Sequence, residues 1–178
     1  ILSDYAWYSL VSAAIASGDA DVVIVADAAT LPTLKKNPDI ELIKSNAGYY
    51  LMMWMMVDTP PFDDVRVRQA LKLVQDRQTI VDLALLGYGF PMNDNPIRPG
   101  SSHAYSSDII PQDIAQAKAL LTEAGQSDLT VDLYTGATEL IPGLNSMVQA
   151  YKEMAAQAGI TVNIVTAPSA SYYEEVAH

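Results

Sequence analysis

The alternation of apolar and polar residues predicts helices and strands in turn along the 178-residue chain. In the first third, apolar side chains at helical spacing predict a helix over 3–17 and a short helix over 30–36. Segments of about strand length predict strands in the same part of the chain. A buried strand is expected over 21–26, and two more strands over 40–44 and 49–57.

Two helices are expected in the middle of the chain, each begun by a short carboxylate. Asp63 or Asp64 begins the first, which runs to about Gln75, and Asp76 begins the second, which runs to Leu86. An aspartate at this position accepts hydrogen bonds from the free N–H groups of the first helical turn.

The last third predicts a helix over 111–124, a strand over 129–134, a helix over 142–158 and a strand over 160–165. A strand–helix–strand unit implies a parallel pair of strands. A further helix is expected from Ser169 onward. The predicted fold class is therefore α/β, with a mixed sheet covered by helices on both faces.

The longest irregular stretch covers residues 88–107. It is polar but contains apolar side chains, which favours an ordered loop, and ordered long loops are often functional. Its Asn-Asp-Asn run lacks the spacing and the later glutamate of a calcium loop, so two interpretations stay open: a turn, or a loop that contacts a ligand. The candidate contacts in this loop are Tyr88, Phe90, Asn93, Asp94 and Asn95.

The run Met52–Met56, with Trp54 at its centre, is unusually apolar. Successive side chains of a strand point to opposite faces, so both faces of this strand are apolar. A central strand covered on both sides explains this pattern. The alternative is an adaptable surface for a ligand or a partner, because methionine repacks easily. The exposure of Trp54 distinguishes the two.

Charge and composition exclude several functions. Half of the residues are apolar, which suits a globular core, and the net charge is -11, which repels nucleic acid and anionic membranes. The absence of cysteine removes disulfides and thiolate chemistry. The apolar runs are too short for a membrane span, and the N-terminus does not read as a signal peptide.

No arrangement typical of catalysis or of cofactor binding is found in the sequence. The Gly87-Tyr88-Gly89 run follows a helix and has Met92 where a dinucleotide fingerprint needs a third glycine. His103 and His178 lie far apart and do not have metal-ligand spacing. We therefore expect no catalytic residues, no metal and no cofactor, and a protein that is not an enzyme.

The segment Pro60–Ala70 (PPFDDVRVRQA), followed by Asp76-Arg77-Gln78, resembles the family 5 extracellular solute-binding proteins, of oligopeptide, dipeptide and nickel type. The resemblance continues through most of the chain. The further matching segments are Leu86–Gly89, Asn93–Ile97, Ala115–Gly125 and Met154–Ile160.

This resemblance implies a periplasmic or extracytoplasmic protein that delivers a small solute, peptide-like or other, to the permease of an ABC importer. Such proteins have two lobes with a cleft between them, and residues 1–178 resemble part of one lobe. We therefore expect a single truncated α/β lobe whose partners are the solute and the missing lobe. Trp54, Tyr172 and Tyr173 complete the candidate ligand contacts.

The sequence leaves two questions open. The solute is not specified, since peptides, sugar oligomers, opines and metal chelates all occur among such relatives. The chain is alternatively an excised or engineered module that binds no ligand and self-associates through exposed apolar surface.

Overall fold

The computed structural model describes residues 4–24, 26, 28–44, 50–97, 108–136 and 143–167. In these residues the helices are α1 (Asp4–Ser17), α2 (Leu31–Leu34), α3 (Val65–Leu73), α4 (Arg77–Leu85), α5 (Ile114–Glu123) and α6 (Leu144–Gln157). The strands are β1 (Thr130–Gly136) and β2 (Thr161–Ala167).

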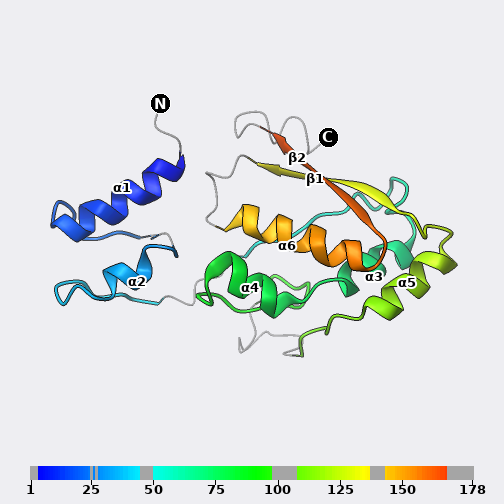
Figure 1. Ribbon diagram of the computed structural model, residues 1–178, viewed down its shortest axis with the longest axis horizontal. Helices are drawn as coiled ribbons and strands as arrows, with labels where there is room; N and C mark the ends of the chain where they lie inside the picture. The colour runs from blue at the N-terminus through cyan, green and yellow to red at the C-terminus, as the bar shows by residue number, and fades with distance from the viewer. Residues whose placement is uncertain are drawn as a thin grey trace.

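The two strands form a parallel pair joined through α6, as the sequence predicts (Figure 1). Their register runs from Thr130 opposite Thr161 to Gly136 opposite Ala167. Side chains alternate between the core and the solvent along most of both strands. On the outward face, Asn163 Nδ2 donates to Asp132 Oδ1 across the pair at 2.9 Å.

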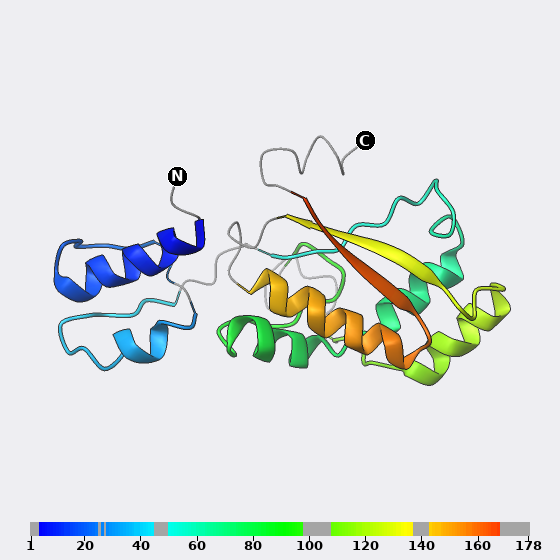
Figure 2. The ribbon, with the colours of Figure 1, turned by 45° about the horizontal axis from the view of Figure 1, so that its top comes forward.

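The core lies between the strands and the helices. Helix α3 packs on α5, while α6 packs on both α4 and β2. Figure 2 shows these helices on one side of the two strands. The buried cluster consists of Val67, Ala70, Leu71, Val74, Ala117, Leu121, Leu129, Tyr151, Ala155, Ala158, Ile160 and Val162.

The helix starts follow the expected capping chemistry. Asp64 accepts from the backbone N–H of Arg66, and Asp76 accepts from that of Thr79. Helix α5 begins later than position 111, because Asp113 is its N-cap and accepts from the N–H of Gln116. A short acidic side chain thus fixes the first residue of α3, α4 and α5.

Side chains from distant elements hold the junction between α3 and α4. The hydroxyl of Tyr151 donates to the carbonyl of Leu71 at 3.1 Å, and Gln112 Nε2 donates to the carbonyl of Val74 at 2.8 Å. The sulfur of Met154 accepts from the N–H of Asp76 at 3.4 Å. Burial raises the pKa of the Tyr151 hydroxyl, so it stays protonated and remains a donor.

The strands predicted over 21–26, 40–44 and 49–57 are wrong for the described residues of these ranges, which form no strand. A strand is defined by a ladder of backbone hydrogen bonds to a neighbouring strand. No described residue forms such a ladder with these segments. The expected mixed sheet with helices on both faces is therefore, in the described part, a parallel pair with helices on one side. The helix expected from Ser169 lies outside the described residues.

Helices α1 and α2 lie together at one end of the molecule, apart from α3–α6 (Figure 1). The hydroxyls of Ser12 and Thr30 are 3.1 Å apart and link the two segments. Val22, Ile24 and Ile43 flank these helices and are strongly exposed. This end contributes no residue to the main buried cluster.

We expect Asp64→Asn to weaken the dependence of stability on acid pH. The Arg66 side chain and its N–H donate to Asp64 and lower the pKa of its carboxyl from 3.8 to about 2. A carboxyl whose pKa is lower in the folded chain stabilises the fold above its unfolded pKa, and this contribution is lost as pH falls towards 2. Urea unfolding at pH 6, 4 and 2 measures the difference. The neighbouring Asp63→Asn is the control, and an equal effect of both substitutions would contradict this explanation.

We expect Tyr151→Phe to lower the free energy of unfolding by about 1–2 kcal/mol, because the buried carbonyl of Leu71 loses its hydroxyl donor. Chemical denaturation at neutral pH measures the change. Tyr134→Phe removes the hydroxyl of a half-exposed tyrosine on β1 and should have almost no effect. Equal losses from the two substitutions would show that the Tyr151 hydrogen bond does not stabilise the fold.

Candidate functional site

The loop that follows α4, residues 88–97, contains five of the predicted contact residues. It begins where α4 ends in two residues of left-handed conformation, Leu86 at φ 48° and Gly87 at φ 78°. The N–H of Tyr88 then donates to the carbonyl of Leu85 at 2.8 Å. The Gly87-Tyr88-Gly89 run is thus a helix end and a turn.

The polar side chains of this loop bind the protein itself. Asn93 Nδ2 donates to the carbonyl of Asp108, and Asn93 Oδ1 accepts from the N–H of Ile110 at 3.1 Å. Asn95 Oδ1 accepts from the N–H of Ile97 at 2.9 Å, which closes a local turn. The two amides therefore fix the loop and its contact with 108–110.

Asp94 lies between two cationic side chains. Its carboxylate is 2.9 Å from Arg77 Nη2 on α4 and 3.5 Å from Lys72 Nζ on α3. The residue is in the left-handed region at φ 55°, which aspartate tolerates better than most side chains. Arg77 Nη1 also donates to the carbonyl of Met92 at 3.2 Å. One ion-pair cluster therefore joins two helices to the loop.

The Arg77 side chain is only 10% exposed and occupies the first position of α4, where the helix dipole disfavours a positive charge. Its Nε and Nη2 atoms have no aligned acceptor in the described part of the chain. The short distance from Nη2 to Asp94 is thus an ion pair without hydrogen-bond alignment, and we attribute its attraction to charge. Asp94 supplies the negative charge that this buried guanidinium needs.

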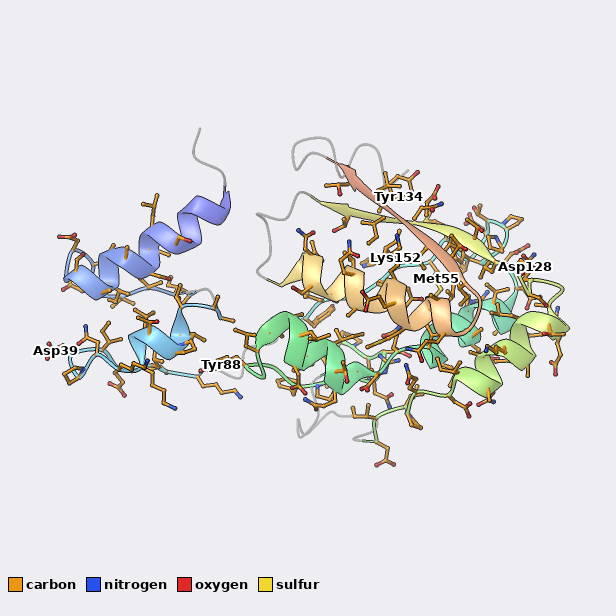
Figure 3. All side chains as sticks on the ribbon, viewed as in Figure 1. Asp39, Met55, Tyr88, Asp128, Tyr134 and Lys152 are labelled. Carbon is orange, nitrogen blue, oxygen red and sulfur yellow. The ribbon has the colours of Figure 1, made fainter. Side chains whose placement is uncertain are left out.

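Tyr88 and Phe90 precede these anchors and remain accessible to solvent. Figure 3 shows Tyr88 at the end of α4 that is nearer to α2. The loop therefore combines inward polar side chains with accessible aromatic side chains.

Trp54 is 83% exposed, and Met52 and Met56 are accessible on the same side of the segment. Met53 and Met55 pack against the core, as Met55 does in Figure 3. The interpretation as a central strand covered on both sides is therefore wrong for the described residues, because they form no strand and one side is exposed. The alternative, a surface for a ligand or a partner, stays a prediction.

Tyr172, Tyr173, His103 and His178 lie outside the described residues. Arg77 and Lys72 were not anticipated as part of this site. A signal for Arg77 was present, because a cation in the first turn of a helix calls for a nearby carboxylate. The spacing of the sequence does not identify Asp94 as that carboxylate.

Among the described residues, no group of three or more histidine or acidic side chains is arranged to hold a metal ion. No described helix is long and apolar enough to cross a membrane. A half-open cavity of about 250 Å³ takes no lining residue from 50–57 or 88–97. It is lined by Lys118, Leu121, Thr122, Ser127, Ala158 and Gly159.

The family model for bacterial extracellular solute-binding proteins, family 5 (middle), matches residues 9–178, and the chain belongs to this family.

Two curated relatives illustrate the similarity. The chain is 37% identical over 95 residues to the glutathione-binding protein GsiB of Salmonella typhimurium, a match that covers 53% of this chain and 18% of the relative. It is 28% identical over 163 residues to heme-binding protein A of Haemophilus influenzae, which covers 88% of this chain and 29% of that relative. The chain therefore spans less than a third of the length of either relative.

The fold is similar to that of the periplasmic binding protein DppA of Helicobacter pylori, whose structure contains the peptide STSA. The TM-score is 0.78 at 21% identity, and the match covers 94% of this chain and 32% of DppA. This similarity establishes the fold as that of part of a periplasmic binding protein, and the α/β class predicted from the sequence is confirmed.

Proposed function

We propose that residues 1–178 form part of one lobe of a periplasmic or extracytoplasmic solute-binding protein that serves an ABC importer. The observation that carries this proposal is the match of residues 9–178 to family 5. The solute class we propose is peptide-like or another small solute. The partners are the second lobe and the importer's permease.

The accessible aromatic residues are the best candidates for contact with the solute. Trp54, Tyr88 and Phe90 each expose a large surface. Their rigid side chains lose little conformational entropy when a ligand covers them. Asn93, Asp94 and Asn95 are proposed to act mainly through the shape of the loop, since their polar groups are engaged by the protein. Tyr172 and Tyr173 remain predicted contacts.

Binding by this chain alone should be weak. A closed binding site typically buries about 70–90% of a small ligand, whereas one lobe contacts a single side of it. The role proposed here requires recognition and closure of two lobes, and it needs no chemical step. The chain is accordingly proposed to act as a binding protein and not as an enzyme.

We expect weak binding of a small solute at the accessible aromatic residues. Glutathione and the peptide Ser-Thr-Ser-Ala, each added at millimolar concentration, serve as probes in NMR spectra of the isotope-labelled chain. At least one probe should shift the signals of Trp54, Tyr88 or Phe90, while Tyr134, an exposed tyrosine on β1, serves as the internal control. Calorimetry should detect no micromolar affinity.

Two results would contradict this proposal. Micromolar affinity for either probe would show that the chain alone forms a complete site. Shifts that are absent, or as large at Tyr134 as at the three aromatic residues, would remove the proposed contact surface.

A second candidate function is self-association, which is favoured by the accessible apolar side of the segment 50–56. Tyr50, Met52, Trp54 and Met56 all lie on it, and the segment carries no charge. Its backbone has no ladder partner in the described residues, so a second copy can pair with it as a strand. The net charge of -11 on each copy opposes this association, and salt screens the repulsion.

We expect Trp54→Ser to weaken any such association several-fold, because the largest accessible side chain of the segment is removed. Sedimentation equilibrium at low and high salt measures it, with stronger association expected at high salt. Ile24→Ser, which alters a strongly exposed isoleucine of another segment, is the matched control. A wild-type chain that stays monomeric at millimolar concentration would rule this function out.

A further inference from the structure

The loop 88–97 has little packing to hold it in place. Every residue in this range is at least partly exposed, and none belongs to the buried cluster. Segments with few buried apolar contacts open at low free-energy cost. The conformation of this loop therefore depends on polar and ionic contacts.

Among these contacts, Asp94 links the loop to both neighbouring helices, through Lys72 on α3 and Arg77 on α4. Its left-handed backbone conformation adds a cost that the ion pairs offset. The Asn93 amide provides the second attachment, to the segment 108–110. These adjacent residues fix the loop at one point after the aromatic pair.

Arg77 in turn depends on Asp94. Without the Asp94 carboxylate, the guanidinium would be a nearly buried positive charge at the positive end of α4, facing Lys72. It would then lower its free energy by turning towards water, and this movement would break its hydrogen bond to the carbonyl of Met92. Loss of the Asp94 charge thus removes two attachments of the loop together.

Tyr88 and Phe90 lie between two fixed points. The α4 end and the Tyr88–Leu85 hydrogen bond precede them, and the Met92–Asp94 attachments follow. Side chains held in this way lose less entropy when they bind a ligand.

We propose that Asp94 is a positioning residue, whose ion pairs with Arg77 and Lys72 hold the loop 88–97 so that Tyr88 and Phe90 are presented to the solute. The presentation of Tyr88 and Phe90 to a solute rests on the proposed solute-binding function. The effect of Asp94 on the conformation of the loop can be measured without any solute.

Hydrogen exchange of the full chain tests the positioning role, with Asp94→Asn as the main variant. Asparagine keeps the size and tolerates the left-handed backbone, so the substitution removes mainly the charge. Exchange at 88–97 and at Ile110 should rise about tenfold, while exchange in α6 and β1 stays unchanged. Asp82→Asn, an exposed aspartate on α4 bonded to Gln78, should leave the loop unaffected.

A second variant separates charge from backbone strain. Asp94→Gly removes the carboxylate and also relieves the left-handed conformation. Faster loop exchange in both variants supports the ion pairs as the cause. Unchanged loop exchange in Asp94→Asn, an equal rise in the core, or slower exchange in Asp94→Gly would overturn the proposal.

The solute probes then distinguish failure of this inference from failure of the proposed function. Glutathione and Ser-Thr-Ser-Ala should shift the signals of Tyr88 and Phe90 less in Asp94→Asn than in the wild-type chain. Equal shifts in both proteins would overturn the role of Asp94 in presenting these side chains. A loosened loop with no probe response in either protein would support Asp94 as the loop's anchor and contradict the solute-binding function.

Discussion

The packing of α6 against β2 and the α3–α4 junction is the contact on which the rest of the structure depends. Its inner face places Tyr151 and Ala155 in the buried cluster, and the C-cap residue Ala158 joins them there. The same face provides the hydroxyl and the sulfur that bind backbone groups of Leu71 and Asp76. One helix thus contacts the parallel pair through β2 and holds the junction at which α4 follows α3.

The position of the candidate loop follows from that junction. Asp76 caps α4 and accepts hydrogen bonds that lower the pKa of its carboxyl, while the next residue, Arg77, sends its side chain towards the loop. Lys72 reaches the same carboxylate from the end of α3. The loop is therefore located by the two helix ends and by charge, whereas the core is located by apolar burial.

The sequence predicts well those features that are determined locally. Asp64 and Asp76 cap helices because capping needs a carboxylate and the next few N–H groups, and these lie within four residues. The strand–helix–strand unit was recognisable because each of its elements has a clear period. The strands expected over 40–44 and 49–57 failed because a strand also needs a neighbour, which an apolar run does not specify.

The candidate site was predictable in part for the same reason. The 88–97 loop was recognisable by its length and composition. The ion pair between Asp94 and Arg77 was not, because helix α4 and a turn with left-handed residues separate the two in the sequence. The exposure of Trp54 depends on which side of an apolar segment meets the core. When the side chains on both sides of a segment are apolar, the sequence does not show which side packs on the core.

The hydrogen bond between Asn163 and Asp132 bears on how this sheet can be extended. Together with the exposed threonines Thr130 and Thr161, it gives the outward face at the start of β1 and β2 a surface suited to water. A further layer packed on that face would have to strip polar groups of their hydration without replacing it. Additional polypeptide, from this protein or from another, is therefore better accommodated beside the strands than on top of them.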